Sequence, residues 1–338
     1  MSMRESRESS ARQTARNVIR GITRHENFAL GIILVVIAIV LAVITGGRSI
    51  APGNVRNVIV QSSTRGIASI GQAFAILGGN FDLSVGGIAL LATVLSASMM
   101  TNLPEYNILG SPVPMAVAIP IMLLAGLGVG TLNGLSVSRI KMPPLIVTLA
   151  MWQMTKGIAY QICKGYTIIE LPQSLAFGQS YLAGVPVPVI FFVAVVAIGF
   201  FVLYYTTFGR SVYASGGNPV SAWLSGVKVH NVTLYTYMIS GFLAALAGLI
   251  TMSRTMCGTM MSMSGLELDT IAAVCIGGVS LMGGRGTLTG VVIGVLIIGT
   301  INNGMTVIGL NPAFQDLVRG GVIFAAVAVD YTRRSRAA

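Results

Sequence analysis

The sequence predicts an all-α fold, a polytopic membrane bundle of about ten transmembrane helices with broken or re-entrant segments. Of its 338 residues, 54% are hydrophobic and 9% are charged, whereas soluble domains carry roughly 25% charged residues. Apolar runs recur along the chain at about the twenty-residue length that crosses a hydrocarbon core. These runs do not alternate apolar and polar residues, so helices are favoured over a membrane β-barrel.

Residues 28–45 form the first uncharged apolar run, after an Arg-rich segment over 1–27. The run exceeds the roughly 7 to 15 residues of a signal-peptide h-region, and no A-x-A-like cleavage site follows it. We therefore expect a retained first span after a cytoplasmic tail over 1–27. The membrane domain is expected over 28–332, and a short cytoplasmic tail over 333–338.

Further apolar runs follow, and hydropathy defines their ends only approximately. The second span, 66–77, and the eighth, 270–282, are short and glycine-rich, so each is either a plain span or a broken, re-entrant helix. A broken helix is tolerated in a membrane only where protein or water covers its free backbone groups. The other runs are 83–100, 115–137, 145–162, 187–205, 232–251, 288–305 and 317–329.

The positions of Lys and Arg set the predicted orientation. With ten spans, most of the 21 Lys and Arg residues fall in cytoplasmic segments, and the outer segments hold only Arg48, Arg56, Lys164 and Arg254. This bias follows the positive-inside rule, so both termini and the loop 208–230 are predicted to be cytoplasmic. The net charge of +11 is attributed to topology and to anionic lipid, and no nucleic-acid partner is expected.

The polar segment 208–230 interrupts the hydrophobic second half of the chain and must lie in water. Gly216 and Gly217 are predicted to break the chain. Asn218 then has the residue type of an N-cap, and Pro219 suits the first position of a helix, where no backbone donor is needed.

The short helix predicted here has one apolar face. Val220, Trp223 and Leu224 fall at i, i+3 and i+4, and Gly226 supplies the stop. A helix of this length is not stable alone in water. Its apolar face is therefore expected to lie in the groove of a partner, on its own protein, or in the lipid interface.

Polar side chains in or beside the apolar runs are candidates for a transport pathway. Asp82 is also interpretable as a cap of the helix that begins at Leu83, and Lys156 as a snorkelling side chain. Amides deep in an apolar run require water or a hydrogen-bond partner on another helix. The candidates are Asn80, Asp82, Gln153, Lys156, Asn302 and Asn303.

The remaining charges have local interpretations, and no catalytic motif is found. Glu267 and Asp269 are expected to cap the eighth helix, and Asp316 is expected to pair with Arg319 three residues on. The sequence contains no Walker loop, H-E-x-x-H or G-x-S-x-G motif, and its cysteines and histidines lack metal-ligand spacing. The chain is predicted to be a conduit or scaffold without a metal site, and not an enzyme.

Five stretches form a specific combination, although each alone would be weak. They are GGNFDLSVGG, RIKMPPLIVTLAMWQMTKGIA, GRSVYASGGNPVSAWLSGVKV, GLELDTIAAVCIGGVSLMGGRGTLTG and INNGM. Together they resemble the ribose-type ABC sugar transporter permeases, from residue 78 to about residue 305. Asn80 and Phe81 stand where the family usually has a small or polar residue and Ile, and Cys275 stands where Val is usual.

The resemblance implies the membrane subunit of a bacterial importer in the plasma (inner) membrane. Two copies, or one copy beside a sister permease, would pair with two ATPase subunits and receive a sugar from an extracytoplasmic binding protein. ATP and Mg would be bound by the ATPase, so this chain would hold no cofactor. The family's coupling helix matches 209–227, which implies coupling roles for Gly209, Arg210, Gly216, Gly217, Asn218, Pro219, Val220, Trp223, Leu224 and Gly226.

Other functions remain open at this point. A secondary transporter would also use broken helices, but it needs ionisable residues in its core for ion coupling, and this chain offers few. A structural subunit without transport would not need the short cytoplasmic helix. The sugar also stays open among ribose, another pentose, a hexose in furanose form and an autoinducer-like sugar derivative.

Overall fold

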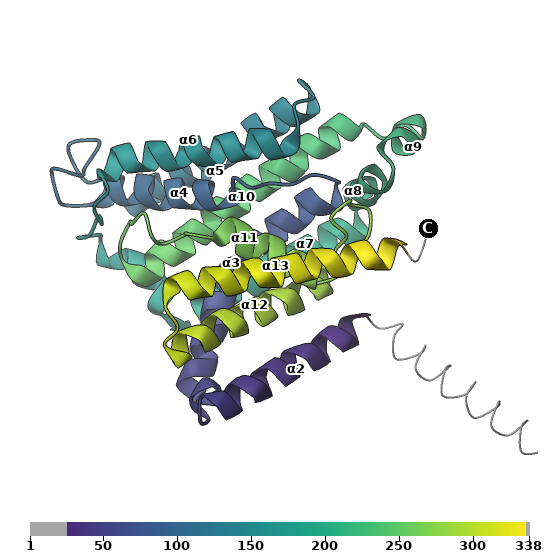
Figure 1. The fold of residues 1–338 in the computed structure, drawn as a ribbon. Coiled ribbons are helices and arrows are strands. Elements are labelled where there is room, and N and C mark those ends of the chain that lie inside the picture. The colour runs from purple at the N-terminus through teal and green to yellow at the C-terminus, as the bar shows by residue number, and fades with distance from the viewer. Residues whose placement is uncertain (1–25, 336–338) are drawn as a thin grey trace, which may run out of the picture.

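The computed structural model describes residues 26–335, a bundle of helices that run largely side by side (Figure 1). The Arg-rich tail predicted over 1–27 therefore lies almost wholly outside the described residues. The helices are α2 (Glu26–Ile44), α3 (Pro52–Leu77), α4 (Val85–Met100), α5 (Met115–Ser138), α6 (Pro144–Cys163), α7 (Val187–Tyr205), α8 (Thr207–Gly217), α9 (Pro219–Leu224), α10 (Val229–Thr255), α11 (Leu266–Ile276), α12 (Leu288–Ile308) and α13 (Pro312–Ser335).

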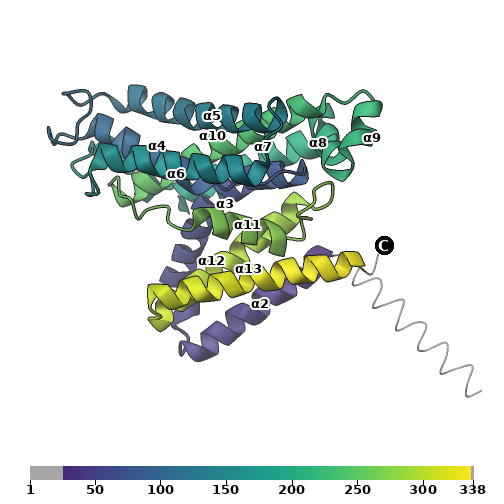
Figure 2. The ribbon, with the colours of Figure 1, turned by 45° about the horizontal axis from the view of Figure 1, so that its top comes forward.

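Short elements cover one end of the bundle. A 3₁₀ helix, η1 (Arg48–Ile50), joins α2 to α3, and a second, η2 (Gln173–Gln179), lies between α6 and α7. It is followed by a two-stranded antiparallel ribbon of β1 (Tyr181–Leu182) and β2 (Val185–Pro186), in which Tyr181 opposes Pro186. The opposite end carries α8 and α9, together with the start of α2 and the end of α13 (Figures 1 and 2).

The predicted fold class is confirmed, because a helix overlaps each predicted apolar run. Within the described residues, five helices are long and apolar enough to cross a membrane, namely α2, α5, α7, α10 and α12. The total of ten spans stays a prediction, because hydropathy alone does not assign the more polar helices α3, α6 and α13. α13 continues to Ser335, so the described part of the C-terminal tail predicted over 333–338 is helical, and the boundary of the membrane domain stays a prediction.

The second predicted span is longer than hydropathy indicated. α3 is a continuous helix of 26 residues from Pro52, so the limits 66–77 are wrong, and Arg56 lies within the helix and not in an outer loop. Several polar side chains inside this helix have local partners, as the Ser63 hydroxyl donates to the Ile59 carbonyl oxygen at 2.7 Å. Such a bond satisfies a buried hydroxyl that has no partner on another helix.

The eighth predicted span is half a helix. α11 has 11 residues, or about 16 Å at a rise of 1.5 Å per residue, half of a hydrocarbon core of about 30 Å. The helix begins and ends earlier than the predicted limits 270–282, and residues 277–287 continue as a non-helical loop. The interpretation of this segment as a broken helix is therefore confirmed, and α3, α12 and α13 cover it.

The core of the bundle is built around α10, which contacts α3, α4 and α5. Its contact with α5 depends on facing glycines. A Cβ atom on Gly130 would overlap the carbonyl oxygen of Tyr237, and one on Gly126 would lie 2.7 Å from the Gly241 carbonyl oxygen. Small residues at these positions let the two backbones approach closely, as is typical of membrane helices.

Asp269 fixes the half-helix α11 to its neighbours. Its carboxylate lies 3.1 Å from Arg65 Nε on α3 and 3.7 Å from Arg319 Nε on α13. The Asn302 side-chain amide on α12 donates to the same carboxylate at 3.0 Å. One carboxylate thus connects four helices. The expectation that Asp269 and Glu267 cap the helix is wrong, because both lie inside its first turn after the N-cap Gly265.

Removal of the Asp269 carboxylate tests this arrangement. Asp269→Ala should leave two guanidinium groups without their buried partner, which costs about 3–5 kcal/mol when one member of a buried pair is removed. The matched control is Asp316→Ala, which removes the exposed carboxylate 3.1 Å from the same Arg319 and should cost at most about 1 kcal/mol. Thermal unfolding of the purified protein, followed by circular dichroism, measures both. Equal midpoints for the two variants would contradict the role of Asp269.

Candidate functional site

The polar segment after α7 forms two helices and not one. Thr206 caps α8, since its hydroxyl oxygen accepts a hydrogen bond from the Gly209 backbone N–H at 3.2 Å. The prediction that Gly216 and Gly217 break the chain is wrong, because both belong to the last turn of α8. The break comes at Asn218, which has a φ of −156°. Gly216 instead allows a close backbone contact with Leu77 and Gly284. Because these residues are far away in the sequence, the neighbours of Gly216 in the chain do not reveal the contact.

The second helix, α9, begins as the sequence predicts. Asn218 is its N-cap, and the side-chain oxygen accepts a hydrogen bond from the Ser221 N–H at 3.0 Å. Pro219 occupies the first position, where its missing N–H is not needed. Gly226 follows the end of the helix with a φ of 86°, in the left-handed region that favours glycine. These features confirm the predicted cap, start and stop.

The apolar face of α9 is not covered by residues 26–335. Val220, Trp223 and Leu224 are 65%, 64% and 73% exposed, and only Ala222 of this helix is buried. Within the described residues, the face therefore does not lie on its own protein. An exposed tryptophan and leucine on one short helix are typical of a docking surface.

The C-terminal end of α8 meets two other segments at a backbone contact that we call the glycine junction, formed by Leu77, Gly79, Gly216 and Gly284. The Gly284 N–H donates to the Leu77 carbonyl oxygen at 2.9 Å. A Cβ atom on Gly216 would overlap that oxygen and lie 2.7 Å from the Gly284 nitrogen. The junction therefore joins α8 directly to the end of α3 and to the 277–287 loop.

A tyrosine strengthens the same connection. The Tyr213 hydroxyl on α8 donates to the Gly286 carbonyl oxygen at 3.0 Å. Burial raises the pKa of Tyr213 above its ordinary value, so the hydroxyl stays protonated and remains a donor at neutral pH. On the neighbouring helix α7, the Tyr204 hydroxyl oxygen accepts from the Leu288 N–H at 3.1 Å. The start of α12 is thus tied to both α7 and α8.

A polar cavity of 560 Å³ opens beside α9, and Trp223 forms part of its wall. Its lining includes three basic residues, Arg139, Lys141 and His230, and no acidic residue. Asn80, one of the pathway candidates, also lines it, and its amide donates to the Gly78 carbonyl oxygen at 3.2 Å. The cavity and the apolar face of α9 together give this end of the molecule a surface that is partly apolar and partly basic.

Asp82 organises a fully buried network near the same end. One carboxylate oxygen accepts from the Ser84 N–H at 2.9 Å, and the other accepts from the Ser240 hydroxyl on α10 at 2.6 Å. The Asn133 amide of α5 donates to the Ser84 hydroxyl oxygen at 2.8 Å. The expectation that Asp82 caps a helix from Leu83 is inaccurate, because α4 begins at Val85 and the carboxylate forms a turn before it.

The remaining pathway candidates lie in separate places. Asn302 bonds to Asp269, whereas the Asn303 side chain faces α3 and exchanges two amide hydrogen bonds with Asn54, at 2.8 and 3.1 Å. The Asn303 and Asn54 amides therefore satisfy each other between α12 and α3, and the Asn302 amide is satisfied by Asp269 of α11. Their part in a pathway stays a prediction.

Gln153 and Lys156 differ from the other candidates because both side chains are exposed on α6. The Lys156 ammonium lies 4.9 Å from the centre of the Trp152 ring. Glu267 on α11 lies nearby, because its Oε2 packs against Gly86 of α4 and Thr155 of α6 packs against the next glycine, Gly87. This buried oxygen of Glu267 has no hydrogen-bond partner within residues 26–335.

The family follows from a comparison with known proteins. A family model described as the permease component of branched-chain amino acid transport systems matches residues 54–327. The chain belongs to this permease family. The five stretches singled out in the sequence thus identified the protein as a permease correctly.

Three relatives illustrate how far this permease resembles characterised chains. The ribose import permease protein of Bacillus subtilis (strain 168) is 38% identical over 297 residues, 87% of this chain and 89% of the relative. The D-allose transport system permease protein of Escherichia coli (strain K12) is 35% identical over 299 residues, 88% and 89% of the two chains. The L-arabinose transport system permease protein of the same strain is 35% identical over 278 residues, 82% of each. No solved structure has significant similarity to the permease.

Several contacts of the permease escaped the sequence reasoning. Arg65 and Arg319 lie within or at the edges of predicted spans, where a cation requires a partner, and the predicted partner of Arg319 was Asp316 alone. Their contacts with Asp269 could not be predicted, since no local pattern relates residues so far apart in the chain. The glycine junction escaped for the same reason, because its members come from three distant segments.

The glycine junction predicts different effects for two adjacent substitutions. Gly216→Ala should force the junction apart, because overpacking of a close contact costs about 1–3 kcal/mol. Gly217→Ala is the matched control, since its Cβ would find only the Gly284 Cα, at 3.9 Å. Limited trypsin digestion of the purified permease reports opening through cleavage after Arg285, which should become about tenfold faster in Gly216→Ala alone. Similar cleavage rates in both variants would show that the contact is not tight.

Proposed function

We propose that this permease is the membrane subunit of an ABC importer for a monosaccharide and that it couples transport to a separate ATPase. The relatives support a sugar, because their names include ribose, D-allose and L-arabinose, two pentoses and a hexose. The proposal therefore extends to the class of monosaccharides and to autoinducer-like sugar derivatives, and names no single sugar. ATP and Mg would be bound by the ATPase, and this chain would supply no cofactor site.

The observation that carries the proposal is the exposed face of α9 together with its connection to the membrane helices. Val220, Trp223 and Leu224 offer an apolar anchor for a partner groove. α9 follows α8, and α8 ends in the glycine junction, so a displacement of α9 acts directly on α3 and on the 277–287 loop. The basic cavity beside α9 suits an ATPase surface that carries acidic side chains.

We propose a bacterial plasma (inner) membrane location with both termini in the cytoplasm. The start of α2 and the end of α13 lie at the end of the bundle that carries α9 (Figure 1), which agrees with the distribution of Lys and Arg. The other partners would be an extracytoplasmic sugar-binding protein at the opposite end and a second permease, either another copy or a sister chain.

The proposed sugar pathway lies on the polar face of α6 and α11. Gln153 and Lys156 are exposed at membrane depth, where contact with hydrocarbon would be costly. A second permease packed across a water-filled space would remove this cost. Sugar hydroxyl groups could then bond to the Gln153 amide and to the Glu267 carboxyl.

Truncation of Trp223 tests the coupling role. Trp223→Ala should weaken ATPase binding by about 2 kcal/mol or more, or roughly thirtyfold, if this aromatic side chain is the anchor. The purified permease should retain less ATPase and should lose the substrate-stimulated part of ATP hydrolysis. Ser221→Ala is the control, because Ser221 lies on the same helix but outside the apolar face. Normal retention with normal stimulation in Trp223→Ala would refute the coupling role.

Thiol labelling tests the pathway face. In a background in which the native cysteines are replaced by serine, Lys156→Cys should react with a water-soluble maleimide, because the reaction requires water and the thiolate. Val193→Cys, exposed on α7, is expected to face lipid and to react at least about tenfold more slowly. If both introduced thiols react equally slowly with the maleimide in the assembled importer, a water-filled pathway at α6 is contradicted.

A further inference from the structure

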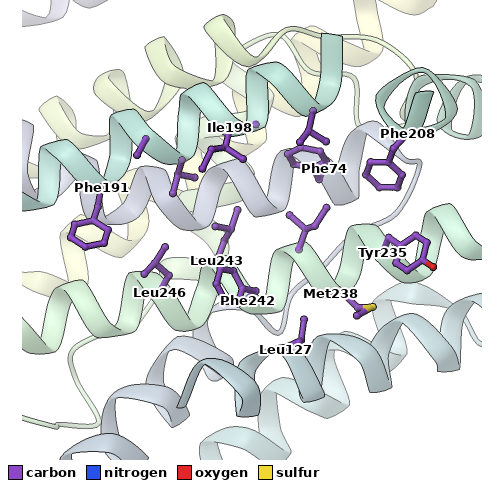
Figure 3. Close-up of a pocket in the computed structure, with 15 residues that line it drawn as sticks. Phe74, Leu127, Phe191, Ile198, Phe208, Tyr235, Met238, Phe242, Leu243 and Leu246 are labelled. Atoms are coloured by element: carbon purple, nitrogen blue, oxygen red, sulfur yellow. The ribbon is translucent and has the colours of Figure 1, made fainter. Parts of the chain in front are cut away.

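An apolar groove runs between α7 and α10 on the surface of the bundle, with α3 forming its floor (Figure 3). Its volume is 860 Å³, and no polar atom contributes to its accessible lining. Phe191 marks one end of the groove, and Phe208 and Tyr235 mark the other, where α8 begins (Figure 3). A surface hollow of this size with no polar lining requires an apolar occupant.

The length of the groove fits one leaflet of a membrane. On α10 it extends from Tyr235 to Leu246, a rise of about 17 Å at 1.5 Å per residue. Half of a typical hydrocarbon core is about 15 Å thick. The groove therefore follows the bilayer from the end near α8 to about its midplane, which is the course of a single acyl chain.

The side chains of the groove argue against a helix as its occupant. Membrane helix interfaces favour small and polar side chains. This groove instead presents the large side chains Phe191, Ile198 and Phe242.

Cationic side chains mark the end of the groove near α8. Arg210 follows Phe208 by two residues and is exposed. On the other side, the Arg139 guanidinium donates to the Asn231 side-chain oxygen at 3.3 Å, one turn before Tyr235 on α10. Within residues 26–335, neither arginine takes part in an ion pair. Arg210 is therefore available to an anion at the membrane surface, and Arg139 stands between this end of the groove and the basic cavity beside α9, which it also lines.

We propose that the groove binds one acyl chain of an anionic phospholipid from the cytoplasmic leaflet, with its phosphate near Arg210 and Arg139. The leaflet assignment rests on the orientation given under the proposed function. The bound chain would contact Phe208 on α8 and Tyr235 on α10, whose rings lie 6.1 Å apart edge to face. The acyl chain would thus fill the space between α8 and α10, and its removal would leave that space empty.

Photo-crosslinking tests this site directly. The full-length permease is placed in nanodiscs that contain a phosphatidylglycerol with a diazirine at the middle of one acyl chain, and the labelled peptides are identified by mass spectrometry. Label should concentrate on the groove residues of α7 and α10. Ala194→Trp, which fills the groove, should reduce this labelling several-fold. Val193→Trp is the matched control, because Val193 is also exposed on α7 but lies outside the groove, and it should leave the labelling unchanged.

The head group is tested with a second probe. Phosphatidylcholine with the same diazirine chain should label the groove less than phosphatidylglycerol, and Arg210→Gln should remove this difference. Equal labelling in Ala194→Trp and Val193→Trp, or label spread evenly over the lipid-facing surface, would overturn the site. Disulfide formation between two copies through Ala194→Cys, without lipid labelling, would assign the groove to a second permease instead. The assay does not measure transport, so its failure leaves the proposed function intact.

Discussion

The backbone contact at the glycine junction determines how the α9 end of this permease is built. Gly216 approaches the Leu77 carbonyl oxygen so closely that no side chain fits between them. Three segments that are distant in the sequence are thereby in direct contact. A backbone contact transmits displacement better than flexible side chains do, because its atoms cannot change rotamer and tightly packed regions deform little. The exposed face of α9 would otherwise be attached to the membrane helices only by its two flanking connections.

The half-helix α11 is the element that this contact reaches. At its C-terminal end, the 277–287 loop meets α8 at Gly284 and Gly286. At its N-terminal end, Asp269 is held by Arg65 and Arg319. α11 is thus held at its C-terminal end by tight backbone packing and at its N-terminal end by ion pairs of a buried carboxylate. In the proposed coupling, a motion at α9 would reach the segment beside Glu267 without a continuous helix between them.

Two surfaces of the bundle meet different surroundings. In the proposed orientation, Gln153 and Lys156 on the surface of α6 lie at membrane depth, which demands water or another protein chain. The groove between α7 and α10 exposes no polar atom, which suits lipid. The same physical rule, the cost of placing a polar group in hydrocarbon, separates the proposed pathway from the proposed lipid site.

The sequence by itself determined the helical membrane class, the family, and the cap, start and stop of α9, because these depend on composition and on residues close together in the chain. Asn218 and Pro219 act within one turn, so their roles could be read locally. The limits of α3 and α11 could not, since Arg65 becomes tolerable in a span only when Asp269 lies beside it. The function of Gly216 was misread for a related reason: local chemistry suggests a chain break, whereas the glycine is needed for an approach to Leu77 and Gly284. Only the tertiary structure decides such positions, because the atoms that constrain them belong to segments far away along the chain.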